Sequence, residues 1–403
     1  HWDAGSIELI TCSATHCYLP AMLREPAGIR AQLQLGVQAF ESLVGRKPLG
    51  MWLPECAYHP EIDAALADAG VRFTILDTHG VTRARPQPPF GEHAPILSPG
   101  GVAFFARDQE SSRSVWSREE GYPGDAYYRD FYRDIGFDLP EEDLYGEVVG
   151  DGNRLMTGIK YYRITGKRVN KQPYIPSVAK ERVWEHAGDF VRNRAMQIDQ
   201  LSRQMNDGGT GVTPVVVSPY DAELFGHWWY EGPMFLEAVF RRLAEENRGV
   251  EPITLRTYLG RHPVAAAATP SASSWGAGGY GEVWVGPKSA WVWRHVHHAT
   301  RYASWLVRQH RDVTGAKGRA LDQVVRELLL LQSSDWPFIL HTGTASGYAL
   351  ARLQAHDHRL RKLAHFVEND VKSNDDAQWL DDVCARDNFL WQLDSDTLRA
   401  PFD

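Results

Sequence analysis

Short apolar runs alternate with amphipathic helical patterns through the first two thirds of the chain, and this alternation is typical of strands wrapped by helices. Helical spacing is clearest at residues 29–43 and 179–205. No glycine-rich strand-to-helix turn marks a dinucleotide site, so a parallel barrel is favoured over an open sheet. The predicted strands are residues 7–11, 49–53, 71–76, 102–105, 214–218 and 253–257.

The chain also predicts two structural units. Between residues 83 and 152 the pattern loosens into proline- and glycine-containing turns, as expected of an inserted loop region over the active face of a barrel. After residues 265–272 strand signals largely stop. Helices are predicted at residues 288–311, 318–331, 348–371 and 378–390. We therefore expect a catalytic barrel at residues 1–268 and an α-helical C-terminal domain at residues 269–403 that contributes to the active site.

Charge and hydropathy narrow the function classes. The 403 residues include 43 Lys and Arg against 51 Asp and Glu, a formal charge of −8, without a dense basic run, so nucleic acid is not expected as a partner. The longest apolar stretches, such as residues 325–331, are too short to span a bilayer. Four scattered cysteines without C-x-x-C spacing favour a reducing cytoplasm. A monomer or weak homo-oligomer is expected.

Histidine groups do not predict a metal site. His295, His297 and His298 lack the i, i+4 pairing of helical zinc ligands, and His356 and His358 lie in a charged amphipathic helix. We expect surface or packing roles for them, and neither a metal nor a cofactor.

Two acids follow predicted strands and could carry chemistry. Glu55 ends the run Trp52-Leu53-Pro54-Glu55, and Asp221 follows residues 214–218 shortly before Trp228-Trp229-Tyr230. Barrels place active-site groups at the carboxyl ends of their strands. Glycoside cleavage needs two carboxyl groups facing one anomeric carbon, although a structural carboxylate remains the alternative for Glu55. Glu223 is expected to be a buried supporting acid.

With these motifs the chain resembles glycoside hydrolase family 57, most closely its α-1,4-glucan branching enzymes. Four sequence blocks carry the resemblance, which extends over nearly all of the chain: residues 10–16 (Ile-Thr-Cys-Ser-Ala-Thr-His), 50–58, 220–233 and 273–279 (Ser-Ser-Trp-Gly-Ala-Gly-Gly). The resemblance implies an incomplete (β/α)7 TIM-like barrel with a helical C-terminal domain, and an α-glucan such as amylose or glycogen as substrate.

The resemblance also assigns site residues. Glu55 matches the family's nucleophile and Asp221 its acid/base. Positions that line the glucan site are matched by His16, Trp52, Arg129, His227, Trp275, Trp284 and Asp335. For Trp275 and Trp284, stacking on glucose is weighed against core packing. Gly276, Gly278 and Gly279 are expected to allow close backbone approach around Trp275.

The acceptor decides the product of such a retaining mechanism. A 6-hydroxyl of another glucan gives a branch, a 4-hydroxyl gives the 4-α-glucanotransferase reaction, and water gives α-amylase hydrolysis. Branching is preferred because the residue 12–16, 221–225 and 333–336 blocks resemble that subgroup. We also hypothesise that residues 108–124 fold over the cleft and limit water access.

Other classes remain open. Family members begin with a strand ending in a His-x-His-Leu-Pro-Tyr-like block, which nothing before His1 supplies, so full activity is expected only from a longer parent protein. An inactive glucan-binding fragment is the non-enzyme alternative. A metal-dependent carbohydrate deacetylase on a similar barrel would need an Asp and His cluster that the sequence does not show, and insensitivity to a chelator would dismiss it.

Overall fold

A computed structural model describes residues 1–144, 149–150, 153–166, 170–207, 209–246, 248–264, 266–390, 393 and 395–399. The chain forms two compact units. The first unit joins His1–Ala106 to Thr254–Asp403, and the second unit is Arg107–Ile253. The predicted boundary between residues 268 and 269 stays a prediction.

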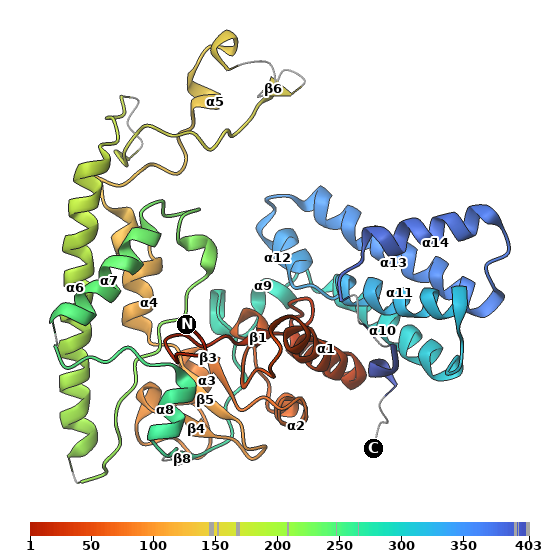
Figure 1. Cartoon of the computed structure of the whole chain (residues 1–403), viewed down its shortest axis with the longest axis horizontal. Helices are drawn as coiled ribbons and strands as arrows, with labels where there is room; N and C mark the ends of the chain where they lie inside the picture. The colour runs from red at the N-terminus through yellow and green to blue at the C-terminus, as the bar shows by residue number, and fades with distance from the viewer. Residues whose placement is uncertain are drawn as a thin grey trace. The chain divides into compact units, whose positions relative to one another are not determined.

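A six-stranded sheet forms the base of the first unit, in the order β1-β2-β3-β5-β4-β8 (Figure 1). Neighbours from β1 to β5 are parallel, β4 is antiparallel to β5, and β8 is parallel to β4. The carboxyl ends of β1, β2, β3 and β5 therefore meet at one edge, where α/β sheets bind ligands. The strands are β1 (Thr11–Cys12), β2 (Gly50–Trp52), β3 (Phe73–Leu76), β4 (Ile96–Leu97), β5 (Ala103–Ala106) and β8 (Ala266–Ala267).

Helix α1 (Pro26–Val44) covers the β1 end of this sheet. It begins with proline, whose missing N–H costs nothing in the first turn, and ends at Gly45 in the left-handed conformation. Gly36 sets its approach, because a Cβ there would lie 2.2 Å from the Cys12 carbonyl oxygen. The Thr11 hydroxyl donates to the Gly36 carbonyl at 2.9 Å. Shorter elements of this region are η1 (Leu19–Met22), η2 (Pro54–Cys56), η3 (Pro60–Ile62), α2 (Asp63–Asp68), α3 (Thr78–Thr82) and η4 (Gly91–His93).

The strand predictions are partly confirmed. The first four correspond to β1, β2, β3 and β5, although β1 begins only at the end of residues 7–11. The strand predicted at residues 253–257 is wrong. Thr254 instead accepts a hydrogen bond from the Thr257 N–H at 3.2 Å and caps α8 (Leu255–Arg261). Residues 214–218 show one isolated bridge, between Arg107 and Val217.

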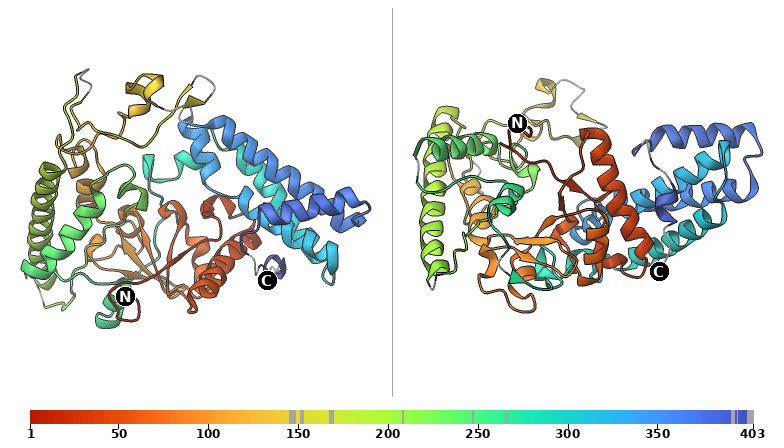
Figure 2. Two further views of the ribbon diagram at one scale, coloured as in Figure 1. Left: turned by 45° about the horizontal axis from the view of Figure 1, so that its top comes forward. Right: turned by 60° about the horizontal axis from the view of Figure 1, so that its bottom comes forward.

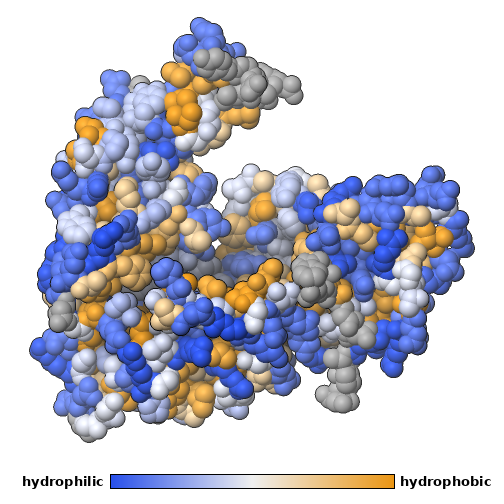
Figure 3. Space-filling model, viewed as in Figure 1, coloured by the Kyte–Doolittle hydropathy of each residue, from blue (hydrophilic) through white to orange (hydrophobic). Residues whose placement is uncertain are grey.

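The C-terminal part of the first unit is helical, as predicted (Figure 1). Its outer surface over α13 and α14 is largely hydrophilic (Figure 3). The elements are η8 (Ala277–Gly279), α9 (Glu282–Val285), α10 (Trp291–Gln309), α11 (Gly315–Leu331), α12 (Asp335–Thr342), α13 (Ser346–Asn369), α14 (Asn374–Arg386) and η9 (Ser395–Leu398). The first unit is thus an α/β sheet joined to a helical part, while the described strands alone do not establish a closed barrel.

The second unit is built on the long helix α6 (Pro176–Asn206), which lies beside α7 (Gly232–Glu246) (Figure 2). Its core includes Tyr128, Trp229 and Phe235. The other elements are α4 (Gln109–Trp116), η5 (Tyr122–Gly124), α5 (Ile135–Asp138), η6 (Glu141–Asp143), the antiparallel pair β6 (Val149–Gly150) and β7 (Asn153–Arg154), and η7 (Ala222–Leu224). The loop region predicted at residues 83–152 therefore contains regular elements, and residues 145–148 and 151–152 lie outside the described residues.

A buried polar network ties α11 to α13. His356 Nδ1 lies 2.7 Å from Glu327 Oε2, and Arg352 Nη2 lies 3.0 Å from His356 Nε2. Arginine can only donate, so Nε2 is the acceptor, Nδ1 carries the proton, and His356 is neutral. Burial, followed by the Arg352 charge, lowers the pKa of His356 to about 4. Burial also raises the pKa of Glu327.

Replacing Glu327 with alanine should destabilise the first unit by about 3–5 kcal/mol, because the His356 N–H and the Gln323 amide, 3.1 Å from Glu327 Oε1, would lose a buried acceptor. Urea unfolding measures the loss. Asp381→Ala is the matched control, since its exposed ion pair with Arg319 is worth at most about 1 kcal/mol. Equal losses in the two variants would contradict the network's role.

Candidate active site

Glu55 lies in the turn that follows β2, and its backbone is strained. Its φ is 61° and its ψ 21°, and Cys56 has a φ of 53°. Such left-handed conformations cost non-glycine residues about 1–3 kcal/mol each and persist where the surroundings fix them. Here the Trp275 N–H donates to the Glu55 carbonyl at 2.9 Å, and the Tyr58 N–H donates to the Ser273 carbonyl at 2.8 Å. The turn is therefore held by the 273–275 segment.

The Glu55 carboxylate is buried and hydrogen-bonded at both oxygens. The Trp275 indole N–H donates to Oε2 at 2.8 Å, and the Ser334 hydroxyl donates to Oε1 at 2.7 Å. His16 Nδ1 lies 3.6 Å from Oε1. Among the described residues, no salt bridge joins this carboxylate to a lysine or arginine. Two neutral donors orient the carboxylate without neutralising it, which suits a nucleophile.

His16 and Asp335 are both neighbours of Ser334, which donates to Glu55. His16 is a further left-handed residue, with a φ of 55°, and its carbonyl accepts from the Ser334 N–H at 2.9 Å. Asp335 opens α12, is exposed, and accepts from the Ser333 hydroxyl at 3.1 Å. Ser333 in turn forms an antiparallel bridge with Cys17. Two segments that lie 318 positions apart in the sequence, at His16 and Ser334, thus meet beside Glu55.

Aromatic rings accompany the carboxylate. Trp52 and Trp275 are half-buried, with ring centroids 5.1 Å apart at 57°. Trp284, in contrast, is only 2% exposed and stacks on Tyr18 at 5.2 Å and 11°. These surroundings are those of a residue packed in the core, which was the alternative for Trp284. The stacking of Trp284 on glucose stays a prediction. Burial raises the pKa of Tyr18 to about 12, so its hydroxyl remains protonated.

The glycines beside Trp275 have the conformations that close approach requires. Gly276, Gly278 and Gly279 all have positive φ, between 75° and 81°. At Gly279 a Cβ would lie 2.8 Å from the His79 ring. His79 Nε2 lies 2.7 Å from the Gly279 carbonyl, which fastens this loop to α3. Gly276 and Gly278 make their closest approaches to Trp284 and Glu282, so the close approach around Trp275 stays a prediction.

The remaining predicted residues lie in the second unit. Asp221 is half-buried and precedes η7, where its carbonyl accepts from the Leu224 N–H at 3.2 Å. His227 is exposed, with its ring 5.5 Å from Phe131. The Arg129 guanidinium lies 3.7 Å from the centroid of the Tyr230 ring. Because Glu55 and Asp221 belong to different units, their pairing as two catalytic carboxyls stays a prediction.

The sequence prediction is wrong for one acid in this unit and omits another. Glu223, expected to be buried, is exposed. Glu231 is the buried one, with Oε1 accepting from the Arg129 N–H at 3.0 Å, and burial raises its pKa. The signal that could have found Glu231 is its position two residues after Trp229, a core aromatic that leaves little water for a carboxyl group.

The second unit contains an aromatic pocket of about 400 Å³. Trp116 and Trp228 are 57% and 47% exposed, and such faces can stack on sugar rings. The lining residues are Trp116, Arg118, Pro123, Arg129, Asp130, Phe131, Tyr132, Ile164, Leu224, Trp228 and Trp229. We call it the Trp116 pocket.

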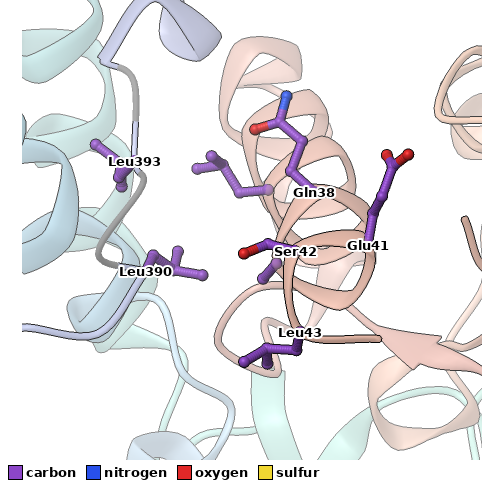
Figure 4. A pocket seen from close by; sticks show the side chains of 8 residues that line it. Gln38, Glu41, Ser42, Leu43, Leu390 and Leu393 are labelled. Carbon is purple, nitrogen blue, oxygen red and sulfur yellow. The ribbon is translucent and has the colours of Figure 1, made fainter. Parts of the chain in front are cut away.

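Another pocket of about 400 Å³ lies in the first unit between α1 and the C-terminal segment, lined largely by aliphatic side chains such as Leu43, Leu390 and Leu393 (Figure 4). It shares no lining residue with the Glu55 group.

One group of the first unit could offer three metal ligands. Atoms of Glu327, His356 and Asp387 lie within 4.8 Å of one another. However, Arg359 donates to Asp387 at 2.8 Å, and Arg352 occupies the free nitrogen of His356. These cations make the group a poor metal site, because a metal would have to displace both.

Among the helices that the structure describes, none has the length and apolar character of a membrane span.

The comparisons agree with this fold and with the sequence blocks. The model of glycosyl hydrolase family 57 matches residues 2–269, and the model described as the C-terminal part of 1,4-alpha-glucan branching enzyme matches residues 295–397. The chain therefore belongs to glycosyl hydrolase family 57, and the resemblance found in the sequence is confirmed.

Individual relatives carry two activities in their names. The 1,4-alpha-glucan branching enzyme of Thermococcus kodakarensis is 34% identical over an alignment of 421 positions, gaps included. The alignment covers 96% of this chain but 58% of that protein. A crystal structure of an alpha-amylase from Thermotoga maritima has a TM-score of 0.89 and 36% identity, covering 100% of this chain and 75% of that one. A branching enzyme from Pyrococcus horikoshii has a TM-score of 0.85 and 32% identity, with coverages of 99% and 73%.

Proposed function

We propose that this chain carries the catalytic machinery of a 1,4-alpha-glucan branching enzyme, which cleaves an α-1,4 bond and forms an α-1,6 branch. The observation that carries the proposal is the Glu55 carboxylate, which is fixed by the Trp275 and Ser334 donors at the end of β2. The branching relatives and the match of residues 295–397 favour this activity within the family.

The mechanism is retaining and proceeds by double displacement. Asp221 gives its proton to the glycosidic oxygen while a Glu55 oxygen attacks the anomeric carbon, so the C–O bond breaks and a glucosyl ester forms. The 6-hydroxyl of an acceptor glucan then gives its proton to Asp221 and attacks the same carbon, which releases the Glu55 carboxylate. His16, Trp52, Trp275 and Asp335 would contact the donor glucan, and Arg129 and His227 would do so from the second unit.

The proposal includes finer features of the protein. We expect an incomplete (β/α)7 barrel, a role in glycogen biosynthesis, and a cytoplasmic monomer or weak homo-oligomer. No disulfide joins any two of the four cysteines, which supports a reducing compartment. α-Amylase activity is the second candidate, favoured by the 36% identity to the Thermotoga maritima protein, and differs only in using water as acceptor.

Incubation with amylose separates these activities. Proton NMR measures α-1,6 anomeric signals, and a reducing-end assay measures hydrolysis. We expect new α-1,6 signal in excess of new reducing ends. Reducing ends without α-1,6 signal would establish the amylase instead. If neither product forms, the chain is a glucan-binding protein without turnover.

Access of water should depend on the Trp116 pocket. A complete deletion of residues 108–124 would remove Val115 from the core and the Asp108 carboxylate that lies 3.5 Å from Arg194, so a point substitution is the cleaner test. Trp116→Ala should raise the ratio of hydrolysis to transfer several-fold, because the exposed ring that we propose covers the acceptor would be lost. Trp184→Ala, which removes a 40% exposed ring from α6, is the control. An unchanged ratio in Trp116→Ala would refute the covering role.

A further inference from the structure

A chain of two hydrogen bonds joins His16 to Glu55 through one hydroxyl group. Ser334 Oγ lies 2.7 Å from Glu55 Oε1 and 2.8 Å from His16 Nδ1. Ser334 is fully buried, and its backbone N–H also holds the His16 carbonyl. The hydroxyl therefore has a fixed position between a carboxylate and an imidazole.

Proton counting fixes the direction of this chain. A serine hydroxyl has a single proton, and an ionised carboxylate can only accept. The Ser334 proton therefore points to Glu55, and Ser334 Oγ is left as an acceptor towards His16. His16 Nδ1 must then carry a proton in both the neutral and the cationic ring. In the neutral ring, Nε2 is consequently the unprotonated nitrogen.

We propose that Ser334 is a positioning residue that fixes the His16 tautomer, so that Nε2 accepts a hydrogen bond from a hydroxyl of the glucan. The inference rests on the proposed function, because it takes Glu55 as the ionised nucleophile. The His16 side chain is 40% exposed, so its ring can be reached by a ligand.

The direction of the chain persists through the reaction. In the glucosyl ester Glu55 still offers only acceptor oxygens, so the Ser334 proton keeps its orientation. A hydrogen bond to an ion is stronger than one to a neutral ester, and Ser334 therefore favours the return of Glu55 to a carboxylate. His16 orients the sugar throughout and exchanges no proton with the nucleophile.

The tautomer can be observed directly in the whole chain. Labelling histidine with ¹⁵N gives separate NMR signals for protonated and unprotonated ring nitrogens, and the His16→Asn spectrum identifies those of His16. At a pH where the ring is neutral, we expect a protonated Nδ1 and an unprotonated Nε2. In Ser334→Ala the Nε2-protonated tautomer should appear. A wild-type spectrum with protonated Nε2 would overturn the proposal without any variant.

Kinetics with amylose provide the second readout. Because a hydrogen bond to a charged group is lost, kcat/KM of Ser334→Ala should fall by about 10- to 100-fold. Ser334→Thr, which keeps the hydroxyl, should recover most of it. Ser304→Ala is the matched control, because that buried hydroxyl has no partner in the described part of the chain.

The outcomes separate this inference from the proposed function. If Glu55→Gln is inactive while Ser334→Ala keeps at least half of the activity and the same tautomer, the positioning role is wrong and the nucleophile stands. If Glu55→Gln retains full activity, the proposed function itself fails. A tautomer change with a rescued Ser334→Thr supports the inference.

Discussion

Glu55→Gln should lower the rate of α-1,6 branch formation by about 10⁴-fold or more, the scale on which loss of a covalent nucleophile acts. Glutamine preserves the size of the side chain, but its amide cannot attack an anomeric carbon. One amide position would also face the Trp275 or Ser334 donor with an N–H group. The measurement is α-1,6 signal by NMR together with reducing ends. Starch binding should survive.

Glu61→Gln is the matched control for this variant. Glu61 is an exposed acid six residues further along the same segment, and its substitution should leave the rate unchanged. Branching by Glu55→Gln at more than a few per cent of the wild-type rate would remove Glu55 from the mechanism.

Asp221→Asn should slow glucan transfer by about 10²- to 10⁴-fold, the usual contribution of a general acid and base. The defect should depend on the leaving group. An α-maltosyl fluoride donor releases fluoride, which needs no proton, so the first step should approach the wild-type rate and a maltosyl-enzyme should accumulate. Mass spectrometry of the intact protein would detect the added sugar.

Glu223→Gln controls for the loss of a nearby charge, because Glu223 is exposed and lies two residues from Asp221. Equal losses with amylose and with the fluoride would show that Asp221 supports the fold and does not donate the proton.

Much of the first unit could be predicted from the sequence, because strand and helix periods report directly on which side chains are buried. Strand β2 and the position of Glu55 after it are examples. The strand prediction at residues 253–257 is wrong because Ile253 and Thr254 favour strands by propensity, whereas the Thr254 side chain caps a helix. Strands β4 and β8 have two residues each, too few to show a period.

The contacts around Glu55 could not be predicted from local sequence patterns. Glu55 meets Ser334 across 279 positions and Trp275 across 220. No spacing rule reports such pairs, and the sequence predicts a site role for Asp335 but none for its neighbour Ser334. The family blocks brought Trp275 and Asp335 to notice, whereas the hydrogen-bonding serine appears only in three dimensions.

The tethering of Glu55 to Ser334 also bears on biosynthesis. A ribosome makes β2 and its turn early, but a nascent chain that ends within α11 still lacks the Ser334 hydroxyl and the Cys17–Ser333 bridge. The strained turn then has only part of its support. The nucleophile therefore reaches its final geometry late in translation, and truncated synthesis products lack an assembled centre.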